Sequence, residues 1–277
     1  MSTITLPPSL SKVQITTLPN SVYYISTFIT PLEEEYLLNK VKPPTFPTTY
    51  PIQKTLNQKP SQITSQPLTS WRTLIHRRLQ VYPAALTPSG ELQKSPLPPW
   101  LEEPLVSRLL ALPLSDSTPA SGKNVFTDSP HQRPNHVLIN EYPPGIGITP
   151  HEDGPAYFPL VATVSLAGHT VLDIYGKNET TGKREPKWRL LQERRSLLIT
   201  TGDVYRETLH GIGDLERDCE LTEATVENWN LLREETREAC LTSGGCLERK
   251  LRISATIRDV VKVRDYARFV PSLGGRR

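Results

Sequence analysis

The sequence predicts a mostly β fold with flanking helices, in which the β part occupies the second half of the chain. The chain has 277 residues, of which 36% are apolar, enough for a real but lean core. Most of its 27 prolines precede residue 160, which favours long irregular segments there. After residue 135, short runs rich in Val, Ile, Leu, Thr and Tyr alternate with glycine, proline or charged residues. Such a succession is typical of a β-sandwich or barrel.

The first half is expected to hold one strand and two helices. Residues 1–20 suggest a flexible arm, and residues 23–28 suggest a strand. Thr30 is expected to cap a helix that begins at Pro31, since proline suits a first helical turn and the glutamates that follow suit its positive end. Apolar spacing predicts a second, amphipathic helix over residues 99–112. Proline-rich or polar loops are expected over residues 42–67, 81–99 and 113–134.

Residues 71–79, WRTLIHRRL, place three arginines beside a tryptophan. One interpretation is a lid that contacts phosphates and stacks on a base. The other is a segment that buries Trp71 and Leu74 and leaves its arginines in water. We favour the second interpretation from the sequence alone.

The second half predicts six strands and one helix. The strands are expected over residues 136–140, 160–166, 170–175, 195–200, 203–208 and 251–263. An acidic segment, residues 214–250, interrupts them and is expected to hold a helix over residues 223–241 that ends at Gly244 and Gly245. Residues 266–277 are expected to form a C-terminal tail.

The stretch NEYPPGIGITPHED ends in a His-x-Asp pair, His151 and Asp153. Side chains two apart on a strand point to the same face, so this imidazole and carboxylate can share one metal ion. A third ligand would complete the two-histidine, one-carboxylate triad of iron(II) oxygenases. His210 is the candidate, because it follows a strand-like run and precedes a glycine. A lone His-x-Asp pair is more often a solvent-facing turn, and four other histidines compete for the third position: His76, His131, His136 and His169.

The run RISATIR predicts a strand with one polar and one apolar face. Its polar members are Arg252, Ser254, Thr256 and Arg258. An inward-facing arginine row needs an anion, and a dicarboxylate pairs well with guanidinium groups. The alternative is a solvated edge strand. Asn140 and Tyr142, also two apart, could hydrogen-bond the same carboxylate, or Tyr142 could be an ordinary core residue.

Together these motifs, in this order and spacing, resemble the AlkB family of iron(II)- and 2-oxoglutarate-dependent dioxygenases. The segments NHVLINEY, PHEDGPAYFP, HTVLDIY, RSLLI, LHGI and RISATIR resemble the eukaryotic branch called AlkB homologue six. The resemblance covers roughly residues 21–265. It implies a double-stranded β-helix (jelly roll) core over residues 135–265, which includes the acidic insert, and an N-terminal substrate-lid region over residues 21–134.

The resemblance also implies a set of site residues. His151, Asp153 and His210 would hold Fe(II), and Arg252 would pair with the distal carboxylate of 2-oxoglutarate. The remaining cosubstrate contacts would come from Asn140, Tyr142, Ser254 and Arg258. The third reactant would be O2.

The implied activity is oxidative N-demethylation of methylated nucleic acid, RNA or DNA, which releases formaldehyde, succinate and CO2. Two alternatives remain open. One is a protein hydroxylase or demethylase of the same chemistry, and the other is a nucleic-acid-binding module whose catalysis is vestigial. A net charge of only +3 predicts no strong phosphate-binding surface.

The cysteines and termini point to an intracellular protein of the cytoplasm, the nucleus or both. Cys219, Cys240 and Cys246 form no Cys-x-x-Cys pair, and their odd number suggests a reducing compartment in which they only pack. The N-terminus lacks the pattern of a signal peptide, and no apolar run reaches membrane-spanning length. A monomer is the default expectation.

Overall fold

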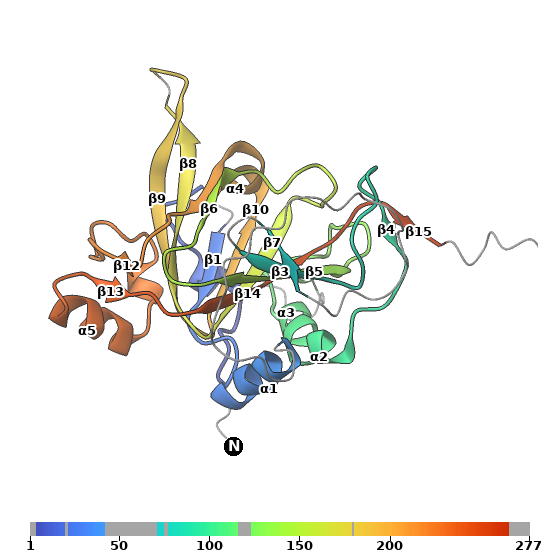
Figure 1. The fold of residues 1–277 in the computed structure, drawn as a ribbon, viewed down its shortest axis with the longest axis horizontal. Helices are drawn as coiled ribbons and strands as arrows, with labels where there is room; N and C mark the ends of the chain where they lie inside the picture. The colour runs from blue at the N-terminus through green and yellow to red at the C-terminus, as the bar shows by residue number, and fades with distance from the viewer. Residues whose placement is uncertain are drawn as a thin grey trace, which may run out of the picture.

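The computed structural model describes residues 4–19, 22–41, 71–74, 77–115, 123–178 and 180–265. The loop expected over residues 42–67, the tail over residues 266–277 and His76 lie outside these ranges. The centre of the described structure is a pair of antiparallel sheets (Figure 1). No helix in the described ranges is long and apolar enough to cross a lipid bilayer.

The two sheets have seven and four strands. In spatial order the larger contains β1 (Val22–Ile25), β10 (Leu197–Thr201), β7 (Leu160–Leu166), β14 (Arg252–Arg258), β5 (His136–Tyr142), β3 (Arg78–Tyr82) and β2 (Arg72–Thr73). The smaller contains β6 (Ile148–His151), β11 (Leu209–Ile212), β8 (Thr170–Lys177) and β9 (Arg184–Gln192). From β5 onward the core strands alternate between the sheets, apart from the β8–β9 hairpin. This is the jelly-roll order, so the predicted fold class is confirmed.

The run predicted as a strand over residues 203–208 is instead the helix α4 (Gly202–Glu207). Gly202 has φ of 60°, a left-handed conformation that turns the chain away from β10. The valine, tyrosine and threonine of this run favour strands, but six residues are too few for a helical period to show.

Helix α1 (Pro31–Val41) begins as predicted. The Glu33 amide donates to Thr30 Oγ1 (3.1 Å), and the Thr30 amide donates to Glu33 Oε2 (2.7 Å), which is a capping box. Glu33 also pairs with Arg108, which joins α1 to α3 (Ser107–Leu110).

The helix expected over residues 99–112 is interrupted. It consists of α2 (Pro99–Leu101), the π-helical turn η2 (Glu102–Val106) and α3. Pro104 lacks an amide hydrogen and disfavours helical backbone at Glu103, whose φ and ψ are -114° and 123°.

The prediction of a flexible N-terminal arm is wrong for residues 4–19. Its 3-10 turn η1 (Leu10–Val13) packs on the core, and Leu10, Ile15 and Leu18 are all buried. The Leu10 amide donates to Pro113 O (2.9 Å), and the Ile15 amide donates to Val22 O (2.9 Å). The segment therefore contributes to the core.

The acidic insert contains β12 (Arg217–Asp218), the 3-10 turn η3 (Trp229–Leu231), α5 (Glu234–Thr242) and β13 (Leu247–Glu248). Helix α5 begins later than predicted, because Asn228 bonds the backbone of Leu191 on β9 through both amide atoms, at 2.9 Å each. The helix ends as predicted: Gly244 and Gly245 have positive φ, and the Gly245 amide donates to Cys240 O (2.7 Å).

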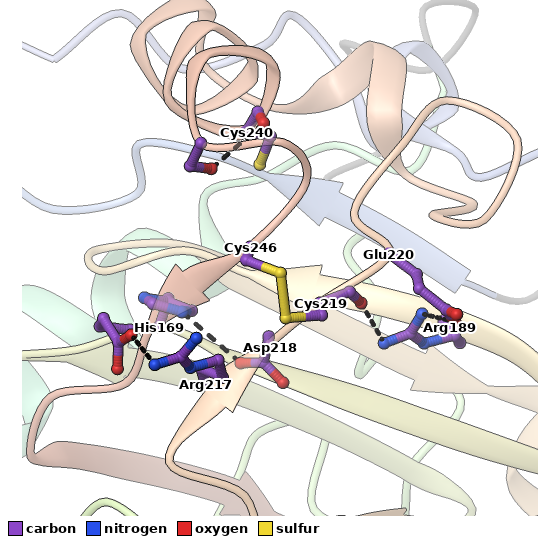
Figure 2. The surroundings of a disulfide bond; sticks show 10 residues. His169, Arg189, Arg217, Asp218, Cys219, Glu220, Cys240 and Cys246 are labelled. Atoms are coloured by element: carbon purple, nitrogen blue, oxygen red, sulfur yellow. Dashed lines mark hydrogen bonds and ion pairs between the residues drawn. A yellow bond between two sulfur atoms is a disulfide. The ribbon is translucent and has the colours of Figure 1, made fainter.

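A disulfide joins Cys219 to Cys246 at the ends of the paired strands β12 and β13 (Figure 2). The expectation that the cysteines only pack is therefore wrong for two of the three, and Cys240 alone stays free and buried. Beside the disulfide, the buried Asp218 accepts two hydrogen bonds from Arg249, at 2.9 and 2.6 Å. A further short pair, β4 (Leu92–Gln93) with β15 (Val263–Arg264), lies apart from the two main sheets (Figure 1).

Candidate metal and cosubstrate site

A cavity of about 300 Å³ lies between the two sheets. Its walls come from strands of both sheets, from α4 and from the loop after β6. The residues predicted to form the site all line it: Asn140, Tyr142, His151, Asp153, His210, Arg252, Ser254 and Arg258. The structure thus brings together side chains that lie up to 118 positions apart in the sequence.

The predicted metal ligands form a compact cluster in this cavity. His151 on β6 and His210 on β11 are directly opposite in the antiparallel pair, and their ring centroids are 4.5 Å apart. Asp153 follows β6, with Oδ1 at 3.8 Å from His210 Nε2. One ligand atom from each of the three residues lies within 4.8 Å of the others, which is suitable for a single metal ion.

The environment of Asp153 fits a cation. Its Oδ1 accepts a hydrogen bond from Arg258 Nη2, whereas its buried Oδ2 has no hydrogen-bond partner among the described residues. An unpaired buried carboxylate oxygen is costly, and a metal ion would satisfy it.

Both histidines are prepared for ligation. His151 Nδ1 lies 2.8 Å from Thr149 O, and donation to this carbonyl leaves the Nε2 lone pair available. Burial lowers the pKa of His210 to about 4, although the Asp153 charge opposes the shift. The His210 imidazole is therefore neutral at pH 7, the form that binds metals.

Arg252 is a buried cation that has only neutral hydrogen-bond partners. It is 3% exposed, and its Nη2 donates to Ser165 Oγ (2.9 Å) and Gln192 Oε1 (3.1 Å). No carboxylate of the described chain forms an ion pair with it. Burial lowers its pKa to about 10, so the guanidinium stays charged at pH 7. A buried arginine of this kind requires an anionic guest.

Polar groups surround Arg252 on the same wall. Tyr142 is directly opposite Arg252 in the β14–β5 pair, and Ser254 is opposite Asn140. At the other end of β14, Arg258 is occupied by Asp153. The two arginines of RISATIR thus differ: Arg258 orients Asp153, a predicted metal ligand, and Arg252 has no carboxylate partner in the described structure.

Sequence reasoning missed several cavity residues. Ser165 and Gln192 hold Arg252, and Tyr157 packs its ring 4.7 Å from the Arg258 guanidinium. The Tyr205 hydroxyl is buried without a partner in the described structure; burial and then the Asp153 charge raise its pKa. Strand alternation could have identified Ser165, which is opposite Ser254 in the β14–β7 pair. Gln192 lies on β9, a strand that was not predicted.

The competing histidines of the described chain lie outside the cavity. His131 pairs with Asp259 (2.7 Å), His136 contacts Ala84 O (3.1 Å), and His169 lies 3.5 Å from Asp218. The cavity also has no lining residue from 214–250, so the acidic insert does not form its wall.

The favoured interpretation of residues 71–79 was wrong in its details. These residues begin a hairpin, β2 and β3, in which Leu74 is 39% exposed instead of buried. Arg78 pairs with Glu141 and stacks over Trp71, and Arg77 lines the cavity.

Comparison with known proteins finds a relative that matches nearly the whole chain. The zebrafish (Danio rerio) protein named "Probable RNA/DNA demethylase ALKBH6" is 34% identical over 261 residues, which cover 92% of each chain. An uncharacterised protein, L905 of Acanthamoeba polyphaga mimivirus, is 27% identical over 132 residues, 47% of this chain and 50% of its own. No family model matches the sequence.

Two solved structures overlap part of the fold. OsALKBH1 has a TM-score of 0.28 and 18% identity, over 46% of this chain and 48% of its own. A prolyl-4-hydroxylase from Pseudomonas putida has a TM-score of 0.24 and 13% identity, over 45% and 48%. Overlaps of this size carry no weight in the family assignment, which depends on the zebrafish relative, matched over 92% of each chain.

Proposed function

Because the chain belongs to the AlkB family of iron(II)- and 2-oxoglutarate-dependent dioxygenases, we propose that it demethylates nucleic acid by oxidising N-methyl groups. His151, Asp153 and His210 would hold the iron. Arg252 would bind the distal carboxylate of 2-oxoglutarate, and Asn140, Tyr142, Ser254 and Arg258 would complete its surroundings.

When bound, the iron, 2-oxoglutarate and O2 supply the oxidising power that hydroxylates a C–H bond. The chain's own residues orient and protect this chemistry. Arg258 fixes Asp153, the Thr149 carbonyl fixes His151, and Ser165 with Gln192 fixes Arg252. Apolar side chains of both sheets, such as Leu138 and Leu172, line the cavity and limit water. A hydroxylated N-methyl group then breaks down to formaldehyde and the free amine.

One observation carries this proposal: a buried arginine without a carboxylate partner lines the same cavity as a three-residue metal cluster. A hydrolytic metal site would give Arg252 no role. A dicarboxylate that reaches from the metal cluster to Arg252 would explain why both lie in one cavity.

The test is to measure succinate and formaldehyde from the iron(II)-loaded protein with 2-oxoglutarate, air and methylated RNA or DNA oligonucleotides. The expected result is formaldehyde in step with succinate, with unmethylated oligonucleotides as the control. Asp153→Ala should abolish both products while its circular dichroism spectrum stays native.

Two other results would contradict the proposal. Succinate without formaldehyde from any oligonucleotide would favour a protein substrate. Iron-loaded protein that binds oligonucleotides but makes no succinate would favour a binding module.

A further inference from the structure

Arg77 is a cation of the cavity wall to which the proposed chemistry assigns no anion. It precedes β3, is half-buried, and lines the same cavity as the metal cluster. Its buried Nε has no hydrogen-bond partner, and no carboxylate of the described residues pairs with it. A guanidinium does not lose its proton at neutral pH, so Arg77 stays positively charged and favours an anionic ligand.

The neighbouring arginine holds the hairpin in place. Arg78 donates from Nε and Nη2 to the two carboxylate oxygens of Glu141, at 2.8 and 2.7 Å. Its guanidinium also lies 4.9 Å from the centroid of the Trp71 ring. Successive side chains on extended backbone point to opposite sides, so anchoring Arg78 to β5 directs Arg77 into the cavity.

In the antiparallel β3–β5 pair Arg78 is opposite Glu141, so this register places Arg77 level with Tyr142. Burial raises the pKa of Tyr142, and the charges of Arg252, Arg77 and Arg258 oppose that rise. Arg77 is therefore close enough for its charge to act on the phenol. Inside a partly enclosed cavity, such a charge interaction is stronger than it would be in water.

The other charged groups of the cavity already have partners or roles. Asp153 is paired with Arg258, and Glu152 lies 3.9 Å from Arg184. Under the proposed function, the metal site formed by His151, Asp153 and His210 and the Arg252 guanidinium would receive the two carboxylates of 2-oxoglutarate. Arg77 is the cation of the described lining that remains without an anion after the cosubstrate is bound.

The sequence on both sides of Arg77 is also positively charged. Residues 36–90 contain seven lysines and arginines and no aspartate or glutamate. The small net charge of the whole chain hides this asymmetry, because the acidic residues concentrate elsewhere, notably in the insert. A basic stretch of sequence that contains a residue of the cavity wall is the pattern expected for a protein with a phosphate-bearing ligand.

We propose that Arg77 binds a backbone phosphate of the nucleic-acid substrate beside the methylated base. This inference rests on the proposed function and names how the site selects its substrate class. A guanidinium holds a phosphate through paired, charge-assisted hydrogen bonds. The same charge disfavours a methylated lysine or arginine on a basic protein segment, so Arg77 favours nucleic acid over protein.

The test compares Arg77→Ala with Arg72→Ala. Arg72 is an exposed arginine of the same hairpin, so its replacement removes the same charge away from the cavity. Binding of an unmethylated single-stranded oligonucleotide to the iron(II)-loaded protein is measured by fluorescence anisotropy at several salt concentrations. We expect Arg77→Ala to weaken binding about 10-fold and to reduce the salt dependence by about one phosphate contact. Arg72→Ala should bind like wild type, and Arg77→Lys should recover part of the loss.

Kinetics separate the two possible anions. If Arg77 holds a phosphate, the KM for a methylated oligonucleotide rises in Arg77→Ala, while the KM for 2-oxoglutarate stays at the wild-type value. A rise in the KM for 2-oxoglutarate with unchanged oligonucleotide binding would overturn the proposal and assign Arg77 to the cosubstrate. Equal losses in Arg77→Ala and Arg72→Ala would also overturn it.

The binding measurement does not depend on turnover. A wild-type protein that yields no formaldehyde would defeat the proposed function, whereas the comparison of Arg77→Ala with Arg72→Ala would still decide the role of Arg77. Thermal unfolding of each variant establishes that any loss of binding occurs in folded protein.

Discussion

Arg252 and Tyr142 are opposite each other in the β14–β5 pair, and the Arg252 guanidinium carbon lies 5.5 Å from the centroid of the Tyr142 ring. The same guanidinium donates hydrogen bonds to Ser165 and Gln192. Arg252 is thereby fixed in orientation before any ligand arrives. Preorganisation of this kind lets the guanidinium meet a carboxylate with little further loss of entropy.

Arg252→Lys should raise the KM for 2-oxoglutarate about 10- to 100-fold, because an ammonium group lacks the planar pair of donors that a carboxylate prefers. The turnover at saturating 2-oxoglutarate should change much less. Initial rates of succinate formation against 2-oxoglutarate concentration measure both quantities. Arg72→Lys is the matched control, and an unchanged KM in Arg252→Lys would contradict the role of Arg252.

A divalent metal should stabilise the folded protein through Asp153. At a free metal concentration about 100 times the Kd, linkage predicts about 2.7 kcal/mol of added stability. Thermal unfolding with and without Fe(II) under anaerobic conditions measures the effect. Asp153→Asn should lose it, whereas Glu152→Gln, at the exposed neighbouring position, should keep it. Equal stabilisation of both variants would place the metal elsewhere.

Acidification should destabilise the protein through His136. Burial lowers the pKa of His136 to about 4 in the folded protein, against about 6.5 in the unfolded chain. The unfolded chain therefore takes up the proton first, and the free energy of unfolding falls as the pH drops from about 6.5 to about 4. The Arg258 charge adds to this depression, while the Ala84 carbonyl opposes it.

The expected loss from His136 over this range is about 3 kcal/mol. His136→Gln keeps an amide donor for Ala84 O but does not titrate, so its stability should fall less steeply over the same range. Urea unfolding at a series of pH values measures both slopes. Parallel slopes for the two proteins would show that His136 does not contribute.

Removal of the Cys219–Cys246 disulfide should destabilise the fold. The bond closes a loop of 27 residues, and the gain in unfolded-state entropy on opening it corresponds to about 3 to 4 kcal/mol. Denaturant unfolding of the Cys219→Ser, Cys246→Ser double variant measures this loss. Wild type treated with a thiol reductant should show the same loss, and the double variant should not respond to the reductant.

Strands can be predicted from the sequence where polar and apolar residues alternate clearly along one strand. RISATIR shows its polar and apolar faces directly, and β7 occupies the range expected for it. His151 and Asp153 are close in sequence, so their proximity in space could be foreseen. The position of His210 opposite His151 depends on the pairing of β11 with β6, which a single sequence does not encode visibly.

Other features depend on long-range contacts. The first half of β9 is polar and exposed, so it resembles a loop in sequence, yet it pairs with β8 along its whole length. The start of α5 is set by the contact of Asn228 with Leu191, between residues 37 positions apart. The support of Arg252 by Gln192 could not be predicted, because Gln192 lies on this missed strand.

The two ends of the insert between β11 and β14 are linked to each other. Gly213 O accepts a hydrogen bond from Arg249 Nη1 (2.6 Å), and the Cys219–Cys246 bond closes the chain just beyond. A single cut of the backbone between these cysteines would therefore leave one covalent molecule, with His210 on one fragment and Arg252 on the other. Residues could be added or removed inside this closed ring without changing the distance between His210, a predicted metal ligand, and Arg252, the arginine proposed to bind the cosubstrate.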